Sequence, residues 1–64
     1  MLDKVKERLD ADNMLYIEYD IAHGKQLVTA QGVKINVYNT NRVVVQGNAI
    51  LKGRVEILLG LKEG

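Results

Sequence analysis

The fold is decided by residues 33–46, which read VKINVYNTNRVVVQ. The first part alternates apolar and polar side chains, the pattern of a strand with one buried face. Asn39-Thr40-Asn41 is rich in turn formers, and a valine-rich run follows it. The stretch therefore predicts two adjacent antiparallel strands joined by a short loop. The residues expected to face the core are Val33, Ile35, Val37, Val43 and Val45.

Two further strands are expected before this hairpin, at residues 14–21 and 25–31. Residues 14–21 alternate clearly, and residues 25–31 alternate more weakly. His23-Gly24 and Gln31-Gly32 are predicted as turns, because glycine accepts the positive φ that tight hairpin loops require. The residues expected to face the core from these strands are Leu15, Ile17, Tyr19, Ile21, Val28 and Ala30.

Helices are expected at both ends of the chain. Apolar residues at spacings of three and four within residues 2–9 predict a short amphipathic helix. Asn48 is a favourable N-cap for a second helix, in which Gly53 costs about 1 kcal/mol relative to alanine. A fifth strand is the alternative for residues 50–61, because residues 54–57 also alternate.

The order helix, four strands, helix predicts an α+β fold: a four-stranded antiparallel sheet with the N-terminal and C-terminal helices packed on one face. A chain of 64 residues has room for one core. No repeat or linker interrupts it, so we expect a single domain over residues 1–64.

Composition narrows the class of protein. Hydrophobic residues make up 47% and charged residues 27%, as in ordinary globular domains. The longest apolar runs have three residues, far below the roughly 20 that a transmembrane helix needs, so no membrane contact is expected. Charged residues break residues 1–8 into apolar runs of at most two, which does not suit a signal peptide and favours a cytoplasmic location.

The net charge of +1 argues against a protein held to nucleic acid by many phosphate contacts, so any such binding is expected to be local. The chain has no cysteine, which excludes disulfides and thiolate zinc sites. No catalytic residue, metal or cofactor is predicted.

The residues that carry catalysis are scarce. There is no cysteine, no serine and one histidine, so a nucleophile paired with a base is not expected and the protein is predicted not to be an enzyme. His23 is interpreted as a solvated turn residue rather than a ligand. Glu18 and Asp20 lie on one side of a strand and could approach a metal ion, but without a third acid an exposed acidic strand is favoured.

The alternation leaves one polar face of the sheet opposite the helices. Amides, hydroxyls, cations and tyrosines on such a face can hydrogen-bond sugars and phosphates and stack on bases, although a solvated face is the simpler alternative. Val44 and Leu27 on the same face would form an apolar patch, which favours a contact surface. The residues assigned to this face are Tyr16, Lys25, Thr29, Gln31, Lys34, Asn36, Tyr38, Arg42 and Gln46.

Residues 33–49 read VKINVYNTNRVVVQGNA and resemble the N-terminal domain of bacterial ribonuclease HIII. The match consists of a strand ending in tyrosine, a polar turn with a basic residue, a valine-rich strand and then Gln-Gly. The resemblance implies a fold similar to half of the TATA-box-binding protein, without catalytic residues, that helps to hold an RNA/DNA substrate. The matching residues are Val37-Tyr38, Arg42, Val43, Gln46-Gly47 and Ala49.

The chain departs from that family in two respects. The nuclease domain is missing, and residues 14–31 form a fuller hairpin. Phenylalanine is absent, so the wedges that TATA-box-binding proteins insert between base steps have no counterpart, and kinking of duplex DNA is not expected.

The first hypothesis is therefore a non-catalytic accessory domain that binds single-stranded nucleic acid or an RNA/DNA hybrid. The alternative is a protein-interaction domain or a self-associating homodimer, for which an accessory protein of a phage or mobile element is one setting. The predicted binding residues are Lys34, Asn36, Tyr38, Arg42, Gln46, Tyr16 and Lys25.

Overall fold

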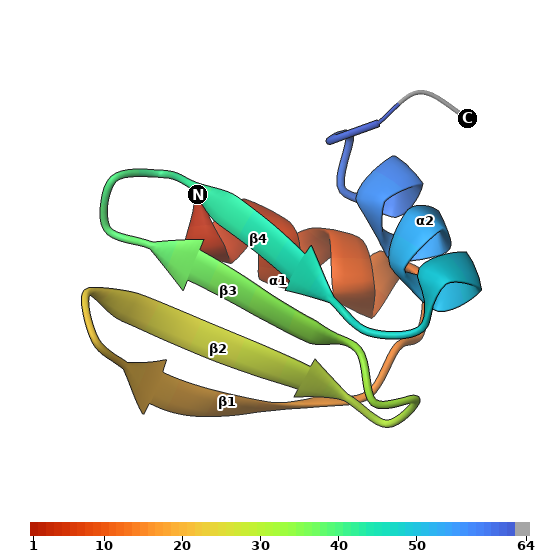
Figure 1. Cartoon of the computed structure of the whole chain (residues 1–64), viewed down its shortest axis with the longest axis horizontal. Coiled ribbons are helices and arrows are strands. Elements are labelled where there is room, and N and C mark those ends of the chain that lie inside the picture. The colour runs from red at the N-terminus through yellow and green to blue at the C-terminus, as the bar shows by residue number, and fades with distance from the viewer. Residues whose placement is uncertain (63–64) are drawn as a thin grey trace.

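The computed structural model describes residues 1–62, and its four strands form one antiparallel sheet in the order β1-β2-β3-β4 (Figure 1). The predicted α+β architecture is confirmed. The alternative of a fifth strand after residue 50 is wrong, because that segment is helical. The last two residues of the predicted domain lie outside the described residues. The elements are α1 (Leu2–Ala11), β1 (Tyr16–Ile21), β2 (Gly24–Thr29), β3 (Lys34–Tyr38), β4 (Val43–Gln46) and α2 (Ala49–Leu58).

Three short loops set the register of the sheet. The β1–β2 loop has two residues, since Ile21 pairs with Gly24. The other two loops have three residues each, because the Thr29 N–H donates to the Val33 carbonyl at 2.9 Å and the Tyr38 N–H to the Arg42 carbonyl at 2.8 Å. Both three-residue loops end in a left-handed residue, Gly32 at φ 85° and Asn41 at φ 66°, the usual geometry for this loop length.

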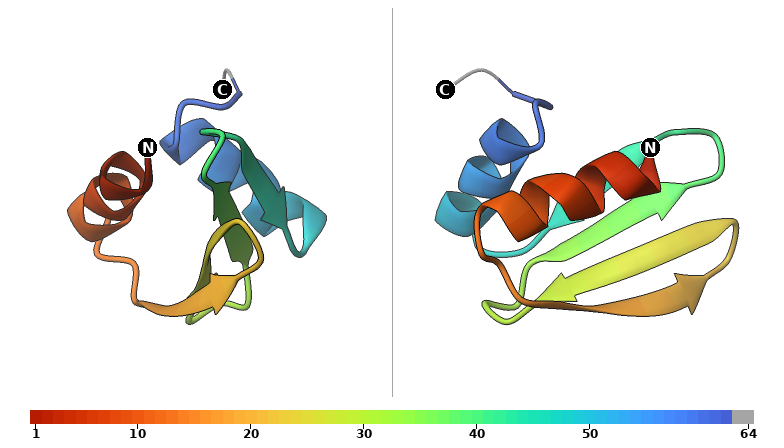
Figure 2. Two further views of the ribbon diagram at one scale, coloured as in Figure 1. Left: turned by 90° about the vertical axis from the view of Figure 1, so that its left-hand side faces the viewer. Right: turned by 180° about the vertical axis from the view of Figure 1, so that it is seen from behind.

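The core lies between the sheet and the two helices. Figure 2 shows α1 across one face of the sheet and α2 beside the end of β4. Val5 and Leu9 from α1 and Val55 from α2 are buried against the strands. The Arg8 guanidinium also donates to the Leu58 carbonyl at 3.2 Å, which ties α1 to α2. The strand residues and the adjoining Val33 in the buried cluster are Leu27, Val33, Ile35, Val37 and Val45.

The predicted faces are right for β3 and β4 and wrong for β1 and β2. Leu27 and Thr29 are buried on the helix side, where Leu27 pairs with Ile35. Ile17 and Tyr19, expected inside, are 61% and 49% exposed. The error arises from the length of the β2–β3 loop: a turn at Gln31-Gly32 was predicted, whereas the loop contains residues 30–32. A slip of one residue moves every side chain of a strand to the other face.

Helix α2 begins where the sequence predicted. The Asn48 side chain accepts a hydrogen bond from the Ile50 N–H at 2.9 Å, which satisfies one of the free donors of the first turn. Gly53 lies within the helix, and a Cβ there would meet nothing within 4 Å. Neither helix in residues 1–62 is long and apolar enough to cross a bilayer.

A candidate nucleic-acid interface on the open face of the sheet

The sheet has one face that the helices do not cover, which we call the open face. Its members follow from the register, because cross-strand partners share a face. Lys34 pairs with Gln46, Gln26 with Asn36, and Tyr19 with Gln26. The residues of the open face are Ile17, Tyr19, Ile21, Gln26, Val28, Lys34, Asn36, Tyr38, Arg42, Val44 and Gln46.

Five of the seven predicted binding residues lie together on the open face. Lys34, Arg42 and Gln46 are exposed, and Tyr38 is half-buried. Asn36 is only 8% exposed, and its Oδ1 accepts a hydrogen bond from Gln26 Nε2 at 3.0 Å. Asn36 therefore belongs to the floor of the face, while Lys34, Arg42 and Gln46 are exposed to solvent.

The other two predicted binding residues, Tyr16 and Lys25, lie on the helix side, so their assignment to the same face is wrong. The Tyr16 ring packs at the margin of the core. Lys25 forms an ion pair with Asp20 across the β1–β2 hairpin. Both assignments are wrong for the same reason, because the side chains of β1 and β2 face the opposite way from the prediction.

Three groups on the helix side favour their protonated forms in the fold. Burial raises the pKa of Tyr16, and the Asp10 carboxylate adds to the effect. A hydrogen bond to Glu18 raises the pKa of Lys6, and one to Asp20 raises the pKa of Lys25. All three groups therefore bind protons more tightly in the folded than in the unfolded chain.

We expect the fold to lose stability in alkali. The ordinary pKa values are 10.0 for tyrosine and 10.5 for lysine, so the contribution of these groups is complete below about pH 10. It is lost as the pH rises through the raised values, because the unfolded chain then binds fewer protons than the folded one. Urea unfolding from neutral pH to about pH 11 measures this, with Tyr16→Phe removing the tyrosine part. A free energy of unfolding that stays constant or rises over this range contradicts the assignment.

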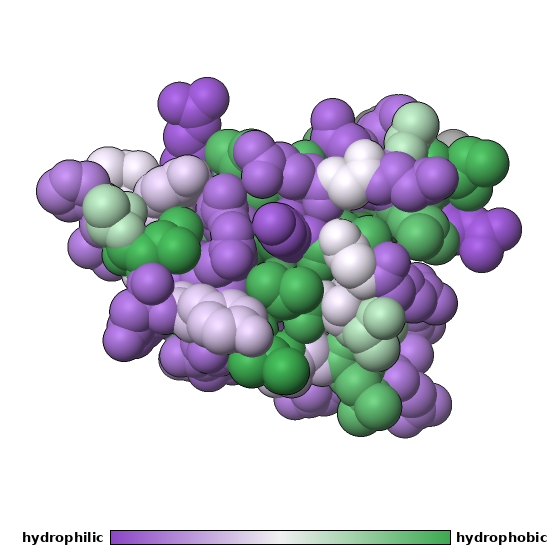
Figure 3. All heavy atoms as spheres, turned by 60° about the horizontal axis from the view of Figure 1, so that its bottom comes forward, coloured by the Kyte–Doolittle hydropathy of each residue, from purple (hydrophilic) through white to green (hydrophobic). Residues whose placement is uncertain are grey.

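The open face also carries residues that the sequence pattern placed in the core. Tyr19 and Ile17 on β1 are exposed, and Val28, which pairs with Ile17, is half-buried beside them. Figure 3, which brings the β1 side of the molecule forward, shows apolar side chains gathered among polar ones. The sequence could have predicted these exposed positions if Gly32 had been interpreted as the left-handed third residue of a three-residue loop, because that loop length puts them on the open face.

The charge on the open face has one sign. Lys34 and Arg42 are its ionised groups, whereas the two carboxylates of the strands lie on the helix side. There Glu18 pairs with Lys6 and Asp20 with Lys25. Among residues 1–62, no group of three or more His, Asp or Glu side chains is placed to hold a metal ion. Within the described part of the chain, the open face therefore presents cations, amides and two tyrosine rings without a competing anion.

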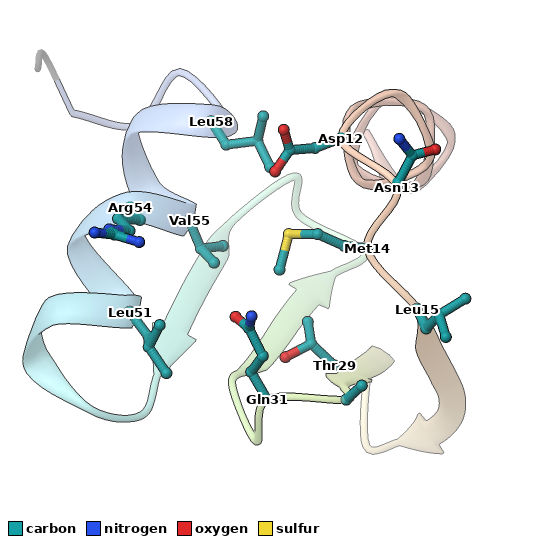
Figure 4. Close-up of a pocket in the computed structure, with 11 residues that line it drawn as sticks. Asp12, Asn13, Met14, Leu15, Thr29, Gln31, Leu51, Arg54, Val55 and Leu58 are labelled. Atoms are coloured by element: carbon teal, nitrogen blue, oxygen red, sulfur yellow. The ribbon is translucent and has the colours of Figure 1, made fainter.

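A separate crevice of about 280 Å³ lies between α2 and the loop that leads from α1 to β1 (Figure 4). The Met14 side chain points into it opposite Val55. Its charged members, Asp12 and Arg54, come from opposite walls, and both are exposed. Among the described residues that line it, only Thr29 carries a hydroxyl, and its Oγ1 accepts from the Val33 N–H at 3.1 Å. The crevice therefore pairs no nucleophile with a base.

Comparisons with protein-family models, curated proteins and solved structures found no match to this chain. Its function is accordingly inferred from the chemistry of the open face.

Proposed function

We propose that the protein is a non-catalytic domain that binds single-stranded nucleic acid, or an RNA/DNA hybrid, on the open face. The observation that carries the proposal is that Lys34, Arg42 and two tyrosine rings share a face to which residues 1–62 contribute no carboxylate. Aromatic side chains on a sheet stack on bases, and nearby cations contact the phosphates. The resemblance of residues 33–49 to a domain that holds RNA/DNA substrates supports the same proposal, and such a ligand fits a cytoplasmic location.

The positions along β3 suit an extended strand of nucleic acid. Lys34 and Tyr38 lie at opposite ends of β3, roughly 13 Å apart at the usual rise of a strand. Arg42 pairs with Tyr38 across the loop, so a cation lies at each end. Gln26 lies between these ends above the buried Asn36, where its amide group can hydrogen-bond base edges or sugars. A few unpaired nucleotides could therefore contact both cations and a ring at once.

Binding should be salt-dependent and confined to this face. We expect the double variant Lys34→Ala/Arg42→Ala to weaken binding and to reduce the salt slope by about one unit for each phosphate that is no longer neutralised. The measurement is fluorescence anisotropy of labelled single-stranded RNA, single-stranded DNA, RNA/DNA hybrid and duplex DNA, at low and physiological salt.

The matched control for this experiment is Lys4→Ala/Arg54→Ala. It removes the same charge from exposed positions on α1 and α2. The control should bind nearly as well as the unaltered protein. Equal losses of affinity in both double variants would show that only net charge matters. Absence of binding to all four ligands at low salt would refute the proposal.

A further inference from the structure

The outer edge of β1 is open along its length. β1 is the first strand of the sheet and, among residues 1–62, pairs only with β2. Proteins usually protect such an edge with charged side chains, proline or a bulge. Residues 15–21 contain no proline and pair without interruption, and their two charges, Glu18 and Asp20, lie on the helix side, where they pair with Lys6 and Lys25. Two side chains along this edge are among the most exposed apolar groups of residues 1–62, Leu15 just before β1 at 76% and Ile17 on the open face at 61%.

The direction of the backbone groups along β1 follows from one hydrogen bond. The Ala30 N–H donates to the Leu15 carbonyl at 2.9 Å, so odd-numbered residues direct their backbone groups toward β2. Hydrogen-bonded and non-hydrogen-bonded pairs alternate in an antiparallel ladder. Tyr16, Glu18 and Asp20 therefore direct their N–H and carbonyl groups outward. These groups are available to a further strand.

Charge selects among the ways in which two copies could pair along this edge. Hydrogen bonding requires outward residues to face outward residues, which leaves axes at Ile17, Glu18 and Tyr19 near the middle of the strand. These axes overlap residues 15–19, 16–20 and 17–21 respectively, and in the first of them Leu15 precedes β1. A two-fold axis at Glu18 would place Glu18 opposite itself, and an axis at Tyr19 would place Glu18 opposite Asp20. Like charges directly opposite one another are destabilising. An axis at Ile17 avoids both conflicts, because it places Glu18 opposite Tyr16.

We propose that two copies of this chain associate through β1, antiparallel and about a two-fold axis at Ile17, to form a continuous eight-stranded sheet. In this register Ile17 lies opposite the second copy's Ile17 on the open face. Leu15 lies opposite the second copy's Tyr19, so the exposed apolar side chains of both edges cover one another. The Tyr16 hydroxyl faces the second copy's Glu18. The same patch thus serves both copies, as a two-fold interface requires.

The interface is small, so the dimer is weak. The pairing of residues 15–19 in the two copies, most of which belong to the six-residue strand β1, falls at the low end of protein interfaces, below about 1,200 Å² in total. Association therefore depends on protein concentration, and a monomer predominates on dilution. Sedimentation over a wide concentration range should show a reversible shift from monomer to dimer without any nucleic acid. This keeps the test independent of the proposed function.

Single cysteines test the register directly, because the chain has no cysteine of its own. Ile17→Cys would place two thiols opposite each other in a non-hydrogen-bonded pair, with Cα atoms about 4.5 Å apart, within the range of a disulfide. The control is Ile50→Cys, which exposes a thiol on α2 at a position 71% exposed. We expect Ile17→Cys to form its intermolecular disulfide at least about tenfold faster than the control under mild oxidation.

Leu15→Cys and Tyr19→Cys complete the test. Each lies about 13 Å from its own counterpart in this register, so neither should cross-link with itself faster than the control. A mixture of the two variants should form the mixed disulfide. Circular dichroism verifies that each variant is folded. A monomer at every concentration with slow Ile17→Cys oxidation overturns the proposal, and rapid self-cross-linking of Leu15→Cys or Tyr19→Cys overturns the register.

Discussion

Leu27→Ala is expected to unfold much of the protein at room temperature. Leu27 is fully buried at the centre of the sheet, opposite Ile35 and beneath α1 and α2. Truncating such a leucine costs about 2–5 kcal/mol, because the transfer free energy is lost and a cavity remains. A domain of this length has a total stability of roughly 3–10 kcal/mol, so the loss is a large part of it. Urea unfolding followed by circular dichroism measures the change.

Leu15→Ala is the matched control for that experiment, since it makes the same chemical change at a position 76% exposed. It should alter the free energy of unfolding by less than about 0.5 kcal/mol. The measurement belongs at a dilution where the monomer predominates, because Leu15 also lies in the proposed β1 interface. The reverse order of effects would mean that the first hairpin has its opposite face toward the helices.

Replacing Tyr19 and Tyr38 with alanine is expected to cause the largest loss of nucleic-acid affinity. Each ring that stacks on a base contributes about 1–3 kcal/mol, so a single variant should bind about tenfold more weakly and the pair more weakly still. Tyr19 is 49% exposed and Tyr38 half-buried, so truncation removes little from the core. Anisotropy titration of the preferred ligand measures both effects.

Phenylalanine at the same positions separates stacking from other roles. Tyr19→Phe and Tyr38→Phe keep the ring and should retain most of the affinity. Affinity that depends on the hydroxyl instead of the ring would contradict the stacking model. Because Tyr19 also borders the proposed dimer edge, Tyr38 gives the cleaner result.

The sequence predicted the order and type of every element in residues 1–62. The change of period from three or four to two separated the helices from the strands, and Asn48 marked the start of α2. For β3 and β4 the faces were also correct, because valine and isoleucine occupy one side and polar residues most of the other. The binding residues predicted on this second hairpin consequently lie on the open face.

The first hairpin shows where local pattern ceased to be sufficient. β1 carries apolar residues on one side and a mixture of tyrosine and acids on the other, so Ile17 and Tyr19 were expected inside. Its pairing with β2 preserves that relation, and the whole hairpin is reversed together. The reversal arises in the β2–β3 loop, which has three residues. A two-residue loop of Gln31-Gly32 would have turned the other face of the first hairpin toward the helices.

The sequence by itself determined the two helices, the four strands and the polar side of β3 and β4. The tertiary structure alone decided which face of β1 and β2 the helices cover, and hence that Tyr16 and Lys25 leave the candidate site while Tyr19 joins it. The physical reason is the period of two in a strand: one residue in a loop exchanges the two faces. Only the assembled sheet, with Leu27 against Ile35 beneath the helices, selects between them.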